Sequence, residues 1–190
     1  MRTLFLAPHN DDEVLFGTFL LLRYRPDVII CLRSERMGDP NYPGGMPIRY
    51  QTRELETSFA MKQLDCQWTQ WPIGDTNPDA EVVETWMNGL RDLASQDDWD
   101  IVFAPAVEEN GHEQHNMIGR LADIVFPDVE RIHYLTYTPE GRSRDGTEVE
   151  FEPDWIAKKL SALACYKSQA AHPATRSHFI DNGLREYIIQ

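Results

Sequence analysis

Apolar runs alternate with amphipathic stretches along most of the chain. Short runs rich in β-branched and aromatic residues predict strands at 2–7, 27–32, 67–71, 100–104 and 132–137. Longer stretches with apolar residues at helical spacing predict helices at 12–24, 47–64, 79–95, 113–125 and 153–168. Strands that alternate with helices are typical of a parallel sheet between two helical layers. We therefore expect an α/β fold, in which residues 1–190 form a single Rossmann-like domain with a mostly parallel sheet and helices on both faces.

Two segments interrupt this alternation. Residues 34–47 are rich in glycine, proline and asparagine, which favour turns, and they predict a long loop. A loop of this length is often a functional lid, although a surface excursion without a role fits the pattern equally well. Residues 138–153 are polar and contain glycine, and they predict a second loop to which the sequence gives no role.

Composition narrows the range of partners. The chain has 190 residues, enough for a substantial core, and a formal net charge of −13, which argues against a nucleic-acid backbone or an anionic membrane as the main partner. No apolar run approaches the roughly 20 residues that span a bilayer. Cys31, Cys66 and Cys165 are far apart, and residues 1–7 lack the pattern of a signal peptide. Reduced thiols and a cytoplasmic location are the expectation.

Chemically active residues crowd the junction between the first strand and the first helix. His9, Asp11, Asp12 and Glu13 lie within five consecutive positions. A helix N-terminus favours carboxylates, so an ordinary acidic cap explains part of this pattern. It does not explain the histidine or three adjacent carboxylates, whose mutual repulsion is most readily offset by a bound cation. The stretch therefore indicates a metal-binding or catalytic site.

A second cluster follows the fourth predicted strand. His112 and His115 are three positions apart, which places them on one face of a helix, although a solvated polar pair is an alternative for this stretch alone. In a doubly wound sheet the first and fourth strands flank the switch point where ligands bind. His9, Asp11 and Asp12 are thus expected in the same crevice as the later histidines. Two histidine nitrogens and a carboxylate oxygen form a familiar catalytic zinc shell.

These motifs resemble those of a known family. Residues 7–13 read A-P-H-N-D-D-E and resemble the P-H-x-D-D-E signature of the PIG-L/LmbE-like zinc-dependent N-deacetylases. Residues 112–115 read H-E-Q-H and resemble the family's H-x-x-H motif. Two weaker similarities are R-x-x-E at 53–56 and K-x-x-A-L at 159–163, the latter followed by S-Q at 168–169. The resemblance spans residues 2–169.

The resemblance implies a role for each residue of the two motifs. His9, Asp12 and His115 would bind zinc, although another divalent transition metal fits such a site as well. Asp11 would act as the general base. His112 would stabilise or protonate the tetrahedral intermediate.

Three further positions bear on the substrate or on the site's surroundings. The family match favours substrate contact for Arg53, for which a solvated helix face is the alternative. Asp75 follows the third strand and is suited to binding substrate hydroxyls, or equally to forming an Asx turn. Gln114 stands where family members often have Asp, so we expect different polar contacts around the last histidine.

The resemblance implies a zinc-dependent hydrolase that removes an N-acyl group, expected to be acetyl, from a small amino-sugar-type molecule such as an N-acetylglucosaminyl compound. One alternative is a metal-dependent hydrolase of another bond, such as a phosphoester, which the few basic residues near the motifs disfavour. Another is an inactive binding module, which the presence of all five motif residues disfavours. The sequence leaves the oligomeric state open.

Overall fold

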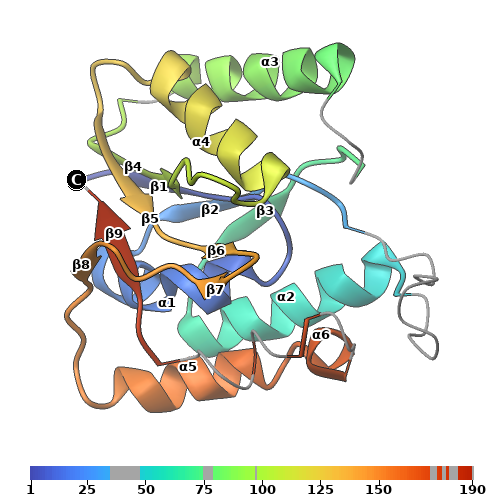
Figure 1. Ribbon diagram of the computed structural model, residues 1–190, viewed down its shortest axis with the longest axis vertical. Coiled ribbons are helices and arrows are strands. Elements are labelled where there is room, and N and C mark those ends of the chain that lie inside the picture. Colours follow the sequence, from blue (N-terminus) through green and yellow to red (C-terminus); the bar gives the residue numbers. More distant parts are fainter. Residues whose placement is uncertain are drawn as a thin grey trace.

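The computed structural model describes residues 1–34, 48–74, 79–96, 98–171, 175–176, 179 and 184–189. Its centre is a seven-stranded sheet with the order β3-β2-β1-β4-β5-β9-β8 (Figure 1). The strands are β1 (Thr3–Ala7), β2 (Asp27–Ile30), β3 (Trp68–Gln70), β4 (Ile101–Pro105), β5 (Glu130–Tyr134), β8 (Thr147–Glu148) and β9 (Tyr187–Ile189). The first five are parallel, and β9 pairs antiparallel with β5 and β8.

Helices cover both faces of this sheet. They are α1 (Asp12–Tyr24), α2 (Tyr50–Leu64), α3 (Ala80–Gln96), α4 (Glu113–Val125), α5 (Trp155–Leu163) and α6 (Lys167–Ala171). In Figure 1, α3 and α4 lie above the sheet, and α1, α2, α5 and α6 lie below it. The expected α/β fold with a mostly parallel sheet is confirmed. None of the described helices is long and apolar enough to cross a membrane.

Strand β1 is buried along its whole length because both of its faces meet helices. Side chains of a strand alternate between the two faces of the sheet. Phe5 and Ala7 accordingly pack in one core cluster with α1 residues, whereas Leu4 and Leu6 pack in a second cluster that contains Trp86 of α3. The strand order reverses between β1 and β4, which pair in parallel. The predicted switch point is therefore present, with the two motifs following the two strands that flank it.

Several boundaries differ from the prediction. Helices α1 and α4 have the predicted bounds, but the helix predicted at 153–168 is two helices, α5 and α6, and the strand predicted at 132–137 begins at Glu130 and ends at Tyr134. The loop predicted at 138–153 is not irregular throughout. It contains β8 and most of a short hairpin formed by β6 (Tyr137–Thr138) and β7 (Gly141–Arg142). Most of the loop predicted at 34–47 lies outside the described residues.

A buried ion pair connects the C-terminal part of the chain to α1. Lys159 Nζ lies 2.5 Å from Glu186 Oε1, and both side chains are fully buried. Lys159 Nζ also donates to the carbonyl oxygen of Leu15 at 3.0 Å, and the Phe19 N–H donates to Glu186 Oε2 at 2.9 Å. Burial lowers the pKa of Lys159 to about 8, although the nearby Glu186 carboxylate raises it in part. Residues far apart in sequence thus hold the backbone of the helix that carries the first motif.

Candidate metal and catalytic site

The ends of β1 and β4 bring the two histidine clusters together. His9 and Asp11 lie between β1 and α1, and His112 is the N-cap residue of α4. The ring centroid of His9 lies 5.1 Å from those of both His112 and His115. A cavity of about 120 Å³ adjoins them, and Asp12 is among its lining residues. The structure therefore places all five residues of the two motifs at one crevice.

Three donor atoms form a nearly equilateral triangle in this crevice. Nδ1 of His9 lies 3.2 Å from Oδ2 of Asp12 and 3.1 Å from Nε2 of His115, which is itself 3.1 Å from the same Asp12 oxygen. Atoms at these separations form one face of a tetrahedron whose centre lies about 1.9 Å from each, close to zinc–ligand bond lengths of roughly 2.0–2.2 Å. Donor atoms of His9, His112 and His115 also lie within 4.8 Å of one another. The residues present fit a metal ion.

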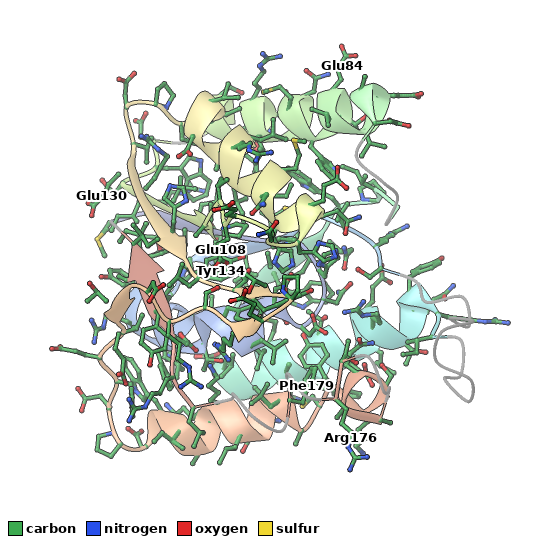
Figure 2. The ribbon with its side chains drawn as sticks, in the orientation of Figure 1. Glu84, Glu108, Glu130, Tyr134, Arg176 and Phe179 are labelled. Carbon is green, nitrogen blue, oxygen red and sulfur yellow. The ribbon has the colours of Figure 1, made fainter. Side chains whose placement is uncertain are left out.

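The orientation of His115 is set by Thr136 and Glu108. Thr136 Oγ1 and the Thr136 N–H both donate to Oε2 of Glu108 at 3.0 Å. Since the hydroxyl hydrogen is used there, Thr136 Oγ1 accepts from Nδ1 of His115, 3.2 Å away. The lone pair of Nε2 is then directed toward Asp12. Figure 2 shows Glu108 in the central part of the molecule. Sequence reasoning missed both partners, because neither belongs to a motif.

Gln114 has a comparable effect on His9. Its amide Oε1 lies 2.6 Å from Nε2 of His9. An amide oxygen only accepts hydrogen bonds, so Nε2 carries the hydrogen and Nδ1 presents its lone pair to the triangle. Gln114, which stands where family members often have Asp, therefore orients the ring of His9. Burial raises the pKa of Asp12, but the facing His115 and His9 outweigh burial and hold it well below its ordinary value.

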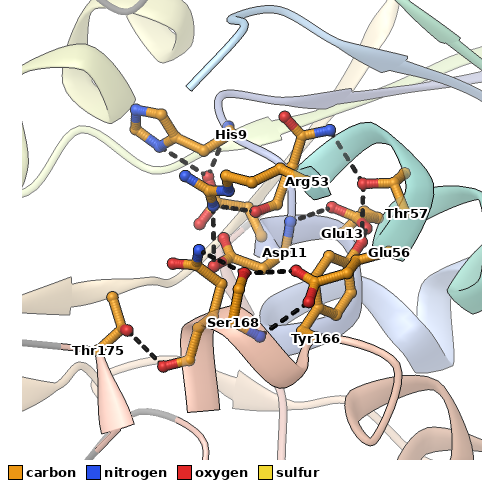
Figure 3. A network of polar contacts seen from close by, with 12 residues as sticks. His9, Asp11, Glu13, Arg53, Glu56, Thr57, Tyr166, Ser168 and Thr175 are labelled. Atoms are coloured by element: carbon orange, nitrogen blue, oxygen red, sulfur yellow. Dashed lines mark hydrogen bonds and ion pairs between the residues drawn. The ribbon is translucent and has the colours of Figure 1, made fainter. Parts of the chain in front are cut away.

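Asp11 has an unusual backbone conformation. Its φ is 116° and its ψ is −28°, a region that non-glycine residues rarely adopt. Arg53 Nη2 lies 3.0 Å from Oδ2 of Asp11, and Arg53 also donates to the carbonyl oxygen of Asn10 (Figure 3). The Asp11 N–H donates to Oε2 of Glu13 at 2.9 Å. These contacts hold the Asp11 carboxylate at the cavity, outside the donor triangle.

Glu13 lies in the first turn of α1, next to Asp12, and is fully buried. Burial raises its pKa to about 8, although a hydrogen bond from the Tyr166 hydroxyl opposes that shift. Because the single Tyr166 hydrogen is used at Glu13, Tyr166 Oη accepts from the Thr57 hydroxyl, 3.1 Å away. Glu13 of α1 is thus linked through Tyr166, which lies between α5 and α6, to Thr57 of α2.

The two weaker sequence similarities meet beside the site. Glu56 of α2 accepts hydrogen bonds from the backbone and the hydroxyl of Ser168 in α6. Arg53 and Gln169, one from each pattern, line the cavity with the motif residues. Gln169 is not among the site residues that the sequence predicts, although it belongs to the S-Q pattern at 168–169. Asp75 lies outside the described residues, so its assignment to substrate stays a prediction.

Comparisons with known proteins bear on the family and the fold of this chain. The model of the PIG-L family, described as GlcNAc-PI de-N-acetylase, matches residues 4–126. A search of curated proteins finds no match.

Several solved structures share the fold. One is a triple mutant of a deacetylase of the teicoplanin biosynthetic pathway, with a TM-score of 0.72 and 16% identity over 99% of this chain and 96% of that one. A second is GalB, the 4-carboxy-2-hydroxymuconate hydratase of Pseudomonas putida, with a TM-score of 0.69 and 14% identity over 99% and 95%. A third is the N,N'-diacetylchitobiose deacetylase of Pyrococcus horikoshii, with a TM-score of 0.66 and 18% identity over 99% and 82%.

At these identities the structural neighbours establish the fold alone. The family match carries more, because it covers more than half of the chain and contains both histidine motifs. The resemblance noted in the sequence is confirmed, and this chain belongs to the PIG-L family.

Proposed function

We propose that this protein is a zinc-dependent hydrolase that removes an N-acyl group, expected to be acetyl, from a small amino-sugar-type substrate. The observation that carries the proposal is the triangle of His9 Nδ1, Asp12 Oδ2 and His115 Nε2, with separations of 3.1–3.2 Å. The de-N-acetylase description of the family and the deacetylase neighbours support the reaction class.

His9, Asp12 and His115 would hold the metal ion. When bound, zinc acts as a Lewis acid and lowers the pKa of a water molecule from about 15.7 to about 7. The hydrogen bonds from the two rings to Gln114 and Thr136 support this assignment, because they leave both lone pairs directed at Asp12. Another divalent transition metal would fit the same donors, and availability helps to decide between them.

Asp11 would be the general base. Its carboxylate lines the cavity but is not part of the donor triangle, and Arg53 holds it in place. In this role it accepts the proton of the attacking water and passes it toward the leaving nitrogen. The conformation at Asp11 supports a functional role, because strained backbone is retained chiefly where the site requires it.

His112 would assist at the acyl carbon. It is the N-cap residue of α4 and lines the same cavity as Asp11, and its ring centroid is 4.9 Å from that of His115. An imidazole in this position donates a hydrogen bond to the oxygen on which negative charge develops, or a proton to the departing amine.

The remainder of the substrate has space in a second cavity that His112 also lines. This cavity of about 400 Å³ is lined by Asn110, Gly111, His112, Tyr137, Thr138, Pro139 and Gly141. It shares His112 and Tyr137 with the first cavity. None of these described lining residues is an acid, lysine or arginine, which favours a neutral ring such as a sugar.

The test is metal analysis of the purified protein together with amine release from N-acetylglucosamine and N,N'-diacetylchitobiose. We expect near-stoichiometric zinc and amine release that a chelator abolishes and added zinc restores. Zinc-loaded protein that releases no amine from either compound would contradict the proposal. A hydratase on the same fold shows that this outcome is a real alternative.

A further inference from the structure

Helices α2 and α6 are joined by a carboxylate that uses both of its oxygens. Glu56 Oε1 accepts from the backbone N–H of Ser168 at 2.7 Å, and Oε2 accepts from the Ser168 hydroxyl at 2.6 Å (Figure 3). Glu56 is 8% exposed, so this link is largely shielded from water. The hydroxyl hydrogen of Ser168 is therefore committed to Glu56.

This link fixes the orientation of the neighbouring amide of Gln169. One amide atom of Gln169 lies 3.2 Å from Ser168 Oγ. Because Ser168 Oγ has no hydrogen left to donate, it accepts here, and its partner must be the donor Nε2. The chain Glu56–Ser168–Gln169 thus determines which end of the amide is oxygen.

The oxygen of this amide is left without a partner. Gln169 is 0% exposed, and its Oε1 accepts no hydrogen bond from any described residue. Burying an acceptor without a donor is costly, so most buried acceptors in native structures are paired with protein groups, water or a ligand. Gln169 lines the cavity that also contains His9, Asp11 and Asp12. A ligand in that cavity would supply the missing donor.

A complementary group lines the same cavity. Arg53 is 5% exposed, and its Nε–H has no acceptor among the described residues, although its Nη2 is bound to Asp11 and Asn10. Arg53 and Gln169 both line the cavity, and between them they have an unused donor and an unused acceptor. A hydroxyl group both donates and accepts, whereas an amide N–H only donates.

We propose that Gln169 Oε1 and Arg53 Nε form a subsite for one hydroxyl group of the substrate, which makes Gln169 a substrate-binding and specificity-determining residue. The inference rests on the proposed function for the identity of the substrate. It selects polyhydroxylated N-acyl amines over N-acyl compounds that lack hydroxyls near the reacting amide.

The test compares Gln169→Leu with the unaltered protein, both loaded with zinc. Binding and amine release are measured for N-acetylglucosamine and for its 3-deoxy, 4-deoxy and 6-deoxy analogues. We expect Gln169→Leu to lower both affinity and kcat/KM for N-acetylglucosamine about 10-fold, the value of one lost hydrogen bond, and to have no effect with one deoxy analogue. Lys167→Ala, on the exposed side of α6, is the matched control.

Stability separates a binding role from a structural one. Gln169→Leu removes the unpaired acceptor together with the 3.2 Å hydrogen bond from Nε2 to Ser168 Oγ. We expect these effects to offset and the melting temperature of the ligand-free protein to change little, whereas a purely structural role would lower it strongly. A lowered melting temperature with equal losses for all four sugars, or unchanged binding of all four, would overturn the proposal.

The two proposals fail differently. Gln169-dependent binding of N-acetylglucosamine without amine release would support the hydroxyl subsite and contradict the hydrolase. Amine release that is the same in Gln169→Leu as in the unaltered protein would support the hydrolase and contradict the hydroxyl subsite. Absence of both binding and turnover in the zinc-loaded protein would contradict both proposals.

Discussion

The hydroxyl of Thr136 lies 3.2 Å from Nδ1 of His115, while Nε2 of the same ring faces Asp12. The two residues come from different elements, since Thr136 follows β5 and His115 is in α4. A histidine that donates from one nitrogen presents the other as a ligand, and such outer contacts tune metal affinity. The donor triangle therefore depends on a residue that is itself unsuited to binding zinc.

We expect Thr136→Val to lower zinc affinity by about 10- to 100-fold, because Nδ1 of His115 loses its acceptor. Thr136→Ser retains the hydroxyl and should bind zinc as the unaltered protein does. Competition with a chromogenic chelator measures both variants. Equal affinity of the valine and serine variants would show that Thr136 does not orient the ring.

Asp11→Asn should retain the metal and lower kcat by about 10²- to 10⁴-fold, since the amide cannot accept a proton. Metal content and amine release from the same preparation provide the measurement. Near-normal turnover in this variant would remove Asp11 from the mechanism. A large loss of metal would instead mean that Asp11 holds the ion.

His115→Ala should lose most of its bound zinc, because it removes one corner of the donor triangle. His133→Ala is the matched control, since His133 lies on β5 and pairs with Asp123 at 3.1 Å. Elemental analysis after dialysis measures the metal. Full occupancy in His115→Ala would require a different ligand set, such as one that includes His112.

Lys159→Met should lower the free energy of unfolding by about 3–5 kcal/mol, because it leaves the Glu186 carboxylate buried without its counter-charge. Lys159→Met with Glu186→Gln removes both charges and keeps an oxygen for the Phe19 N–H. We expect this double variant to recover most of the loss. Urea denaturation of the three proteins measures the difference, and a double variant no more stable than the single one would contradict the account.

The same lysine should make stability depend on pH. Folding lowers its pKa from 10.5 to about 8, so between those values the unfolded chain holds more protons than the folded protein. The contribution of Lys159 to the free energy of unfolding therefore rises with pH across that window, by on the order of 1 kcal/mol per unit. The stability difference between the unaltered protein and Lys159→Met should widen from pH 8 to pH 10, and a constant difference would contradict the assignment.

The sequence predicted those parts of the fold that local patterns determine. Helices α1 and α4 have the predicted bounds because their apolar periodicity begins directly after a motif. Strand β9 was missed because its three residues acquire their place only by pairing with β5 and β8, which are distant in sequence. The break between α5 and α6 was missed because apolar periodicity continues across it.

In the candidate site, too, the sequence predicted some residues and not others. His9, Asp12 and His115 could be brought together from strand order and motif position alone. Thr136 and Glu108 could not, because an ordinary threonine and glutamate become partners of a histidine only in the folded chain. The positive φ of Asp11 could not be predicted from the sequence either, because contacts with Arg53 and Glu13 in the folded chain hold it.

The contacts of Lys159 and Glu186 with α1 have a consequence for when the site forms during synthesis. The five motif residues have all been translated by position 115, but the groups that hold the backbone of α1 lie at positions 159 and 186. The emerging chain therefore carries its metal-binding side chains well before the helix beneath them is fixed. Ordered metal binding is expected to follow the packing of residues 159 and 186 against α1, so the ion is selected by a completed fold rather than by a partly folded chain.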